Sequence, residues 1–132
     1  EVMIWRAAFL ALVVPPALGA DASSADLKCA FSTRIVEVRS LANLPPQVAE
    51  RIISDEAVPF RGLLRAGRQN SHWFVWLAIK GASQRIEVFD FYRGHASLIG
   101  SDNIVAGTNP CEATEIMMKN PSIERLLDSL PE

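Results

Sequence analysis

The chain has 132 residues, 49% of them apolar, and its formal net charge at pH 7 is −2. This length suits one domain with a single hydrophobic core, and the composition is that of a globular chain rather than a disordered one. The near balance of charges gives no electrostatic reason to expect binding to nucleic acid or to an anionic membrane surface.

Residues 1–22 have the features of a cleaved secretory signal. A basic residue precedes an apolar run over 7–14, which is far shorter than the roughly 20 residues that span a bilayer, and two prolines follow it. A buried N-terminal helix is the alternative, which the prolines oppose. We expect cleavage after Ala20 or after Ala22. A single mature domain over 23–132 would then reside in the periplasm or outside the cell, without a lipid anchor or a remaining membrane span.

The two cysteines of the chain, Cys29 and Cys111, are predicted to form one disulfide, because export leads to an oxidising compartment. The alternatives are free thiols, a mixed disulfide with a partner, or a metal site that also uses His72 and His95. The spacing of these four residues matches no compact zinc pattern, and there is no Cys-x-x-Cys motif. We therefore expect neither a metal nor a cofactor.

Two helices are predicted before the sheet. Over residues 30–41 the apolar side chains recur at helical spacing, and Asp26 is a suitable N-cap. A strand interpretation of this segment fails at Glu37. A second helix begins after two prolines and ends near residues 54–55, with one apolar stripe made of Val48, Ala49, Ile52 and Ile53.

From residue 60 to residue 100 the apolar period changes to two, which predicts an antiparallel meander of four strands. The strands are expected at about 61–66, 72–80, 85–93 and 95–99. Residues 67–70 and 81–84 would form the first two connections, and Arg93-Gly94 a tight turn.

One or two helices complete the predicted α+β fold. Asn109, Pro110 and Glu112 have the spacing of a capping box, so a helix should begin there and run to about Lys119. Asn120, followed by a proline, is the predicted cap of a last helix, whose apolar stripe consists of Ile123, Leu126, Leu127 and Leu130. The disulfide would join the first helix to this segment, and the helices would most simply lie on one face of the sheet. Both predicted faces are largely apolar, so helices on both sides are the alternative.

The predicted hairpin register places several aromatic side chains on one face of the sheet. If Lys80 pairs with Arg85, Trp76 lies opposite Phe89 and Phe74 opposite Phe91. An aromatic face with charged ends is typical of a binding site, so the predicted binding residues are Phe74, Trp76, Phe89, Phe91 and Arg93. The alternative is that these aromatic residues are the core beneath the helices.

The tight hairpin also gathers side chains of catalytic type. Asp90 is expected opposite Ser97, and Tyr92 opposite His95. A small hydrolase would use Asp90, His95 and Ser97, but the sequence has no nucleophile elbow and no motif for an oxyanion hole. Strand residues of these types are more often hydrogen-bonded within the sheet.

Three arginines, Arg61, Arg65 and Arg68, form a basic run. We interpret the run as a solvated edge strand, whose charges discourage pairing with other sheets. A site for an anion or an acidic partner is the alternative.

The absence of a catalytic motif favours a non-enzymatic exported binding protein, such as an inhibitor or an accessory subunit, whose partner is another exported protein. The small hydrolase and a structural protein of envelope assembly are the other two hypotheses.

Overall fold

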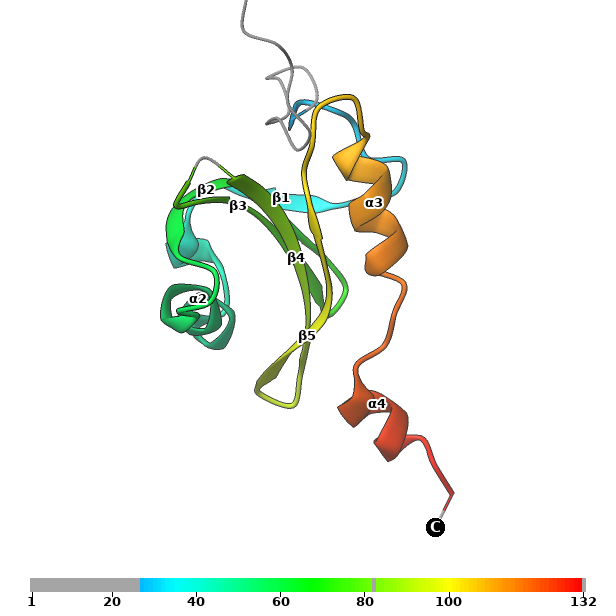
Figure 1. Cartoon of the computed structure of the whole chain (residues 1–132). Helices are drawn as coiled ribbons and strands as arrows, with labels where there is room; N and C mark the ends of the chain where they lie inside the picture. The colour runs from blue at the N-terminus through cyan, green and yellow to red at the C-terminus, as the bar shows by residue number, and fades with distance from the viewer. Residues whose placement is uncertain (1–26, 82, 132) are drawn as a thin grey trace, which may run out of the picture.

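The computed structural model describes residues 27–81 and 83–131 and has an α+β fold (Figure 1). Its centre is a five-stranded antiparallel sheet in which the strands follow their order in the chain. The strands are β1 Val36–Val38, β2 Phe60–Gln69, β3 His72–Ile79, β4 Ser83–Tyr92 and β5 His95–Asn103. The predicted fold class is confirmed, with five strands in place of four. The predicted signal peptide lies outside the described residues.

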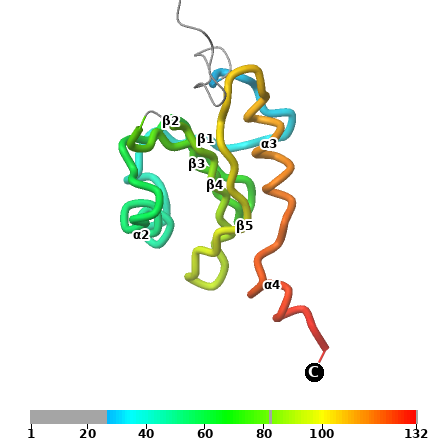
Figure 2. The backbone as a smooth tube through the Cα atoms, in the orientation of Figure 1, coloured from blue at the N-terminus to red at the C-terminus, as the bar shows by residue number. Residues whose placement is uncertain are grey.

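Helical elements lie on both faces of this sheet. They are the short 3-10 helix η1 Leu41–Asn43 and the α-helices α2 Pro46–Ser54, α3 Pro110–Met117 and α4 Ile123–Asp128. Figures 1 and 2 show α2 on one face and α3 on the other, with α4 beyond α3 toward the β4–β5 hairpin. The expectation of helices on one face is wrong, because both faces of the sheet carry apolar side chains that need cover.

Two apolar clusters, one on each face, form the core. The cluster beneath α2 consists of Leu44, Val48, Ile52, Ala66, Val75, Leu77, Phe89 and Ala96. The cluster beneath α3 and the segment 27–35 consists of Phe74, Trp76, Ile86, Val88, Ile104, Cys111 and Met118. A sheet buried on both faces explains why apolar residues occupy consecutive positions in β3 and β4.

The first predicted helix, over residues 30–41, is not formed. Val36–Val38 is instead the edge strand β1, paired with β2, and Leu41–Asn43 is the 3-10 helix η1. Glu37 argues against a strand in the sequence, but its carboxylate accepts two hydrogen bonds, of 2.7 and 2.9 Å, from Arg65 of β2. The neighbouring strand thus supplies both the backbone pairing of β1 and a partner for Glu37, and local periodicity reports neither. The second predicted helix is confirmed as α2.

Strand β2 is longer than the predicted strand 61–66. Gly67 lies inside the strand rather than in a turn, and a Cβ on it would stand 2.7 Å from the ring of Phe74. The turn to β3 consists of Asn70 and Ser71, with Asn70 at a φ of 58°. Asparagine tolerates this left-handed conformation, so a two-residue hairpin replaces the longer loop that we predicted.

The register between β3 and β4 differs from the predicted one by three residues. Trp76 lies opposite Ile86 rather than opposite Phe89, because the hairpin loop is shorter than predicted. Side chains alternate along a strand, so an odd shift reverses which residues of the two strands share a face. Phe74 and Trp76 consequently lie on the α3 face, whereas Phe89 lies on the α2 face.

The tight hairpin between β4 and β5 is confirmed. Arg93 and Gly94 have φ values of 54° and 78°, as a type I′ turn requires at both central positions. Tyr92 pairs with His95 as predicted. After a bulge, β5 continues to Asn103, beyond its predicted end at residue 99.

Both C-terminal helices are present and capped. The side chain of Asn109 accepts hydrogen bonds from the backbone N–H groups of Cys111 and Glu112, which confirms the predicted cap of α3. Helix α4 is capped by Ser122, whose Oγ accepts from the N–H of Arg125, rather than by Asn120. Serine and asparagine cap helices about equally well, so composition alone does not separate the two starts.

Glu87 is a buried charge on the α2 face, with a side chain only 4% exposed. Burial raises the pKa of Glu87, and Arg85, 3.3 Å away, offsets this only in part. A raised carboxyl pKa lowers stability as the pH rises through the folded-state value. We expect Glu87→Gln to raise the free energy of unfolding at pH 7 by about 1 kcal/mol, which is roughly 4–8 °C in the melting temperature. The gain should vanish below the ordinary pKa of 4.5. Thermal unfolding across pH measures this effect, with the exposed Glu112→Gln as the control, and a loss of stability at pH 7 would contradict it.

Candidate functional site

The predicted aromatic binding face does not exist as a surface. Phe74 and Trp76 are fully buried, Phe89 is 1% exposed, and the four aromatic residues are divided between the two faces of the sheet. The indole Nε1 of Trp76 donates a hydrogen bond of 3.0 Å to the Oγ1 of Thr114 in α3. Phe91 is half-buried against the α2 cluster. These residues are core, which is the alternative that the sequence left open.

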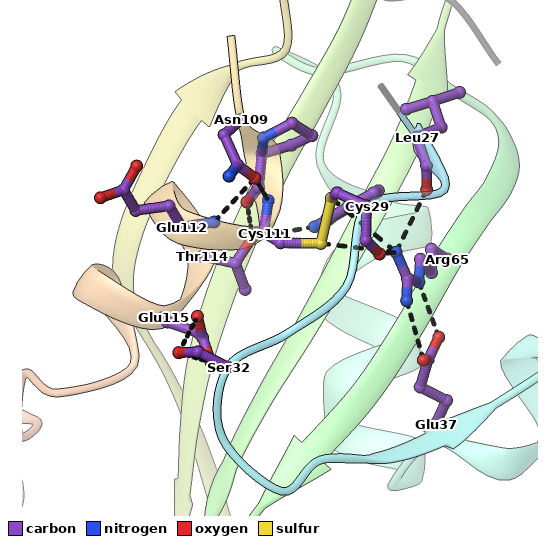
Figure 3. The surroundings of a disulfide bond; sticks show 12 residues. Leu27, Cys29, Ser32, Glu37, Arg65, Asn109, Cys111, Glu112, Thr114 and Glu115 are labelled. Atoms are coloured by element: carbon purple, nitrogen blue, oxygen red, sulfur yellow. Dashed lines mark hydrogen bonds and ion pairs between the residues drawn. A yellow bond between two sulfur atoms is a disulfide. The ribbon is translucent and has the colours of Figure 1, made fainter. Parts of the chain in front are cut away.

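The predicted disulfide is confirmed and joins the segment before β1 to the first turn of α3 (Figure 3). The guanidinium of Arg65 lies beside it and donates to the carbonyls of Leu27 and Cys29 at 3.1 and 2.7 Å. Its other nitrogens bond Glu37, and its plane lies over Phe31 at 4.7 Å and over Trp76 at 5.2 Å. Arg65 therefore attaches the N-terminal segment to the sheet.

The interpretation of the arginine run as a solvated edge strand is wrong for Arg65, whose side chain is 18% exposed. Arg61 and Arg68 are exposed, as predicted. Regular strand alternation would place Arg61 and Arg65 on the same face. The bulges in β2 break this alternation and turn Arg65 toward the α3 face.

Asp90, the first of the three catalytic candidates, is fully buried in a polar cluster. Its carboxylate accepts a hydrogen bond of 2.8 Å from the Oγ of Ser71 and bonds of 3.0 and 3.2 Å from Arg125 of α4. Burial raises the pKa of Asp90, but the hydrogen bonds from Arg125, Ser71 and Ser122 outweigh burial and hold this pKa below its ordinary value. Asp90 is thus an ionised anchor for α4.

The structure does not bring the three catalytic candidates into contact, although they share a face of the hairpin. The Oγ of Ser97 donates to Glu124 of α4 at 3.1 Å, and His95 is exposed at the turn. His72 lies nearer to the buried carboxylate, with its Nε2 3.9 Å from Asp90 and 2.9 Å from the carbonyl of Asn120. Ser97 and Asp90 therefore bond residues of helix α4 rather than His95. Among the described residues, no group of three or more His, Cys, Asp or Glu side chains is placed to hold a metal ion.

Helix α4 is held against the sheet by its polar stripe. Glu124 accepts from Ser97, Arg125 pairs with Asp90, and Asp128 lies 3.3 Å from Arg93. The guanidinium of Arg125 also lies 4.2 Å above the ring of Tyr92. No residue of α4 is buried.

The apolar stripe of α4 points away from the sheet into solvent. Its exposed fractions are 69% for Ile123, 47% for Leu126 and 60% for Leu127, and Leu130, which lies two residues beyond the end of the helix, is 61% exposed. The stripe itself was predicted from the sequence, but its direction was not. A pattern of period 3.6 identifies an apolar face without saying what covers that face.

The edge of the sheet at β1 and β2 is the second unusual surface. β1 pairs with Ala66–Arg68 of the ten-residue strand β2, so the preceding half of β2 is paired on one side only. A hollow of about 540 Å³ lies where β1 ends, lined by Glu37, Val38, Arg39, Leu63, Leu64 and Arg65.

Within the described part of the chain, none of the helices is long and apolar enough to cross a membrane. Comparison of the chain with protein-family models, with curated proteins and with solved structures finds no match.

Proposed function

We propose that this chain is an exported, non-enzymatic binding protein that docks onto a partner protein through the apolar stripe of α4. The observation that carries the proposal is the reversed orientation of the helix. Its charged side chains contact the sheet, while Ile123, Leu126, Leu127 and Leu130 face solvent.

The energetics of this helix favour a binding role over a structural one. A surface helix normally buries its apolar stripe, and each large aliphatic side chain contributes about 1.5–3 kcal/mol when it is fully buried. In this fold the apolar side chains of α4 stay exposed, so their burial does not stabilise the domain. A helix enters an apolar groove of another protein with apolar anchors at i, i+3, i+4 and i+7; Ile123, Leu126 and Leu127 occupy the first three of these positions in α4, and Leu130 follows just beyond its end. A partner with such a groove would bury the stripe.

Export is supported by the disulfide and by the signal-like N-terminal sequence. Structural disulfides persist in oxidising compartments such as the periplasm and the extracellular space. The bond between Cys29 and Cys111 fits that setting. The partner is then another exported protein, and the chain would serve as its inhibitor or accessory subunit.

The double substitution Leu126→Glu and Leu127→Glu tests the docking stripe. Both side chains are largely exposed, so the free energy of unfolding should change by less than about 0.5 kcal/mol. A photo-crosslinker at position 130 of the exported protein should give one discrete adduct with its partner in the native compartment. The double variant should lose that adduct.

The matched control is Ile53→Glu on α2, an apolar residue that is 61% exposed on the opposite face of the sheet. This variant should keep the adduct formed from position 130, and a crosslinker at position 53 itself should give none. An adduct that survives the double substitution, or that forms equally from position 53, would remove α4 as the docking element.

A further inference from the structure

We propose a second binding surface, at the open edge of β2, that takes an extended acidic segment of another protein by strand addition. The segment would continue the line of β1 and pair antiparallel to β2. This inference is independent of the α4 stripe, which lies beyond the far side of the sheet.

The edge is open because β1 is too short to cover its neighbour. Its three residues pair with Ala66–Arg68. The part of β2 before Ala66 pairs with β3 alone, at residues 60, 62, 63 and 65. The chain then leaves the edge through η1 and α2. Within the described ranges, no backbone hydrogen bond joins residues 61–65 to either of those helical elements. An extended segment gains affinity from main-chain hydrogen bonds at such an edge.

At the opposite edge of the sheet, formed by β5, a side chain contacts the backbone. On β5, the guanidinium of Arg51 in α2 donates to the carbonyl of Ala96 at 2.7 Å, and Glu124 of α4 occupies the hydroxyl of Ser97. Covering an edge strand is a common way to prevent unwanted pairing. Arg51 thus occupies one backbone acceptor of the β5 edge.

The hollow beside the bare edge supplies a place for side chains of the added segment. Val38 and Leu63 line it together with Leu64, which is 40% exposed. Alternate side chains of an added strand point to the same face, so one apolar side chain can enter the hollow while its neighbours stay outside. The bulges near residues 61 and 64 interrupt the regular edge, which restricts the added strand to a short one.

The charges of this edge select an acidic segment. Arg39 and Arg61 are exposed and have no ion pair among the described residues, while the one acid in the hollow, Glu37, is bonded to Arg65. The edge is therefore positive on a chain whose net charge is −2. Two copies paired through the same edge would bring like charges together, so the occupant is a segment of a different protein.

The test uses synthetic eight-residue peptides of alternating valine and glutamate, with a valine–lysine peptide as the charge control. The glutamate peptide should bind the oxidised protein with one-to-one stoichiometry, and the lysine peptide should bind at least tenfold more weakly. Two further peptides carry N-methyl groups on either the valine or the glutamate nitrogens, which blocks one or the other hydrogen-bonding edge. One of these should lose binding, and the other should keep it.

Protein variants separate this edge from other basic surfaces and from α4. Arg39→Glu combined with Arg61→Glu should weaken binding of the glutamate peptide at least tenfold, whereas the exposed Lys119→Glu should not. Leu126→Glu with Leu127→Glu should leave peptide binding unchanged, so failure of either proposal is distinguishable from failure of the other. Fluorescence anisotropy of labelled peptides measures all of these affinities.

The proposal is overturned if the glutamate peptide does not bind, or if both N-methylated peptides bind equally. Equal binding of the lysine peptide would overturn the assigned charge preference. Concentration-dependent dimerisation that Arg61→Glu abolishes would assign the edge to a second copy of this chain instead.

Discussion

Removal of the disulfide is expected to lower the free energy of unfolding by about 4–5 kcal/mol. The bond joins residues that are 82 positions apart, and a cross-link over a loop of this length restricts the unfolded chain by about that amount in the chain-entropy estimate. Domains of this size are stable by roughly 5–15 kcal/mol in total. The variant with alanine at both Cys29 and Cys111 should therefore be close to unfolding at 37 °C.

The loss has a structural side as well, because the disulfide fixes the segment that covers the α3 face. Phe31 of this segment packs on Phe74, with ring centroids 5.0 Å apart, and Arg65 bonds the carbonyl of Cys29. Without the bond, amides of residues 29–35 should lose protection from hydrogen exchange before those of β3.

Urea unfolding of the oxidised protein, of the reduced protein and of the double alanine variant measures the effect, with intact mass to verify the redox state. The reduced wild type and the variant should agree with each other. An unfolding midpoint that does not change on reduction would show that Arg65 and the core hold the segment without the cross-link.

Local signals in the sequence predicted the parts of this fold that local chemistry decides. The caps at Asn109, the prolines at the start of α2 and the Arg93-Gly94 turn each act within a few residues, and the structure has all three. The pairing of Cys29 with Cys111 was predictable for a different reason, since only two cysteines exist.

Features that depend on distant partners were not predictable from periodicity. β1 forms by pairing with residues 66–68 of β2, far along the chain, where Arg65 also bonds Glu37. The register between β3 and β4 was not predictable either. Both faces of the sheet are apolar, so neither the predicted nor the observed register exposes core residues, and the apolar pattern cannot choose between them. The predicted aromatic face was wrong because it rested on the wrong register. The outward direction of the α4 stripe was not predictable, because it depends on the contact between Arg125 and the buried Asp90.

Arg125→Ala is expected to lower the free energy of unfolding by about 2–3 kcal/mol and to release α4 from the sheet. Removing one partner of a buried ion pair costs about 3–5 kcal/mol. We expect a smaller cost here, because the Arg125 side chain is 36% exposed and water screens part of its charge. Asp90 would lose both hydrogen bonds from the guanidinium and would keep the hydroxyl of Ser71 at 2.8 Å and the ring of His72 at 3.9 Å. Amides of residues 123–128 should then exchange rapidly.

Two variants distinguish the buried pair from a surface contact. Arg93→Ala removes the ion pair between Arg93, which is 71% exposed, and Asp128, which is 37% exposed. This exposed pair should contribute less than about 1 kcal/mol to the free energy of unfolding. Asp90→Asn in the Arg125→Ala background removes the unpaired charge and should restore part of the lost stability. Equal losses for Arg93→Ala and Arg125→Ala would contradict the role of Asp90 as the anchor.

The loss of stability in acid should be weaker in Arg125→Ala than in the wild type. In the wild type, Arg125 and the hydroxyls hold the folded-state pKa of Asp90 below its ordinary value of 3.8, so its contribution is present above that value and is lost as the pH falls through the folded-state pKa. Without Arg125, the carboxylate of Asp90 loses two of the hydrogen bonds that lower its pKa, so the part of its contribution to stability that acid removes should be smaller. The stability difference between wild type and variant should therefore be largest near neutral pH and should shrink toward acid. An acid-sensitive contact beneath an outward apolar stripe would also make the exposure of α4 to its partner depend on pH, which binding measurements with Arg125→Ala at two pH values would reveal.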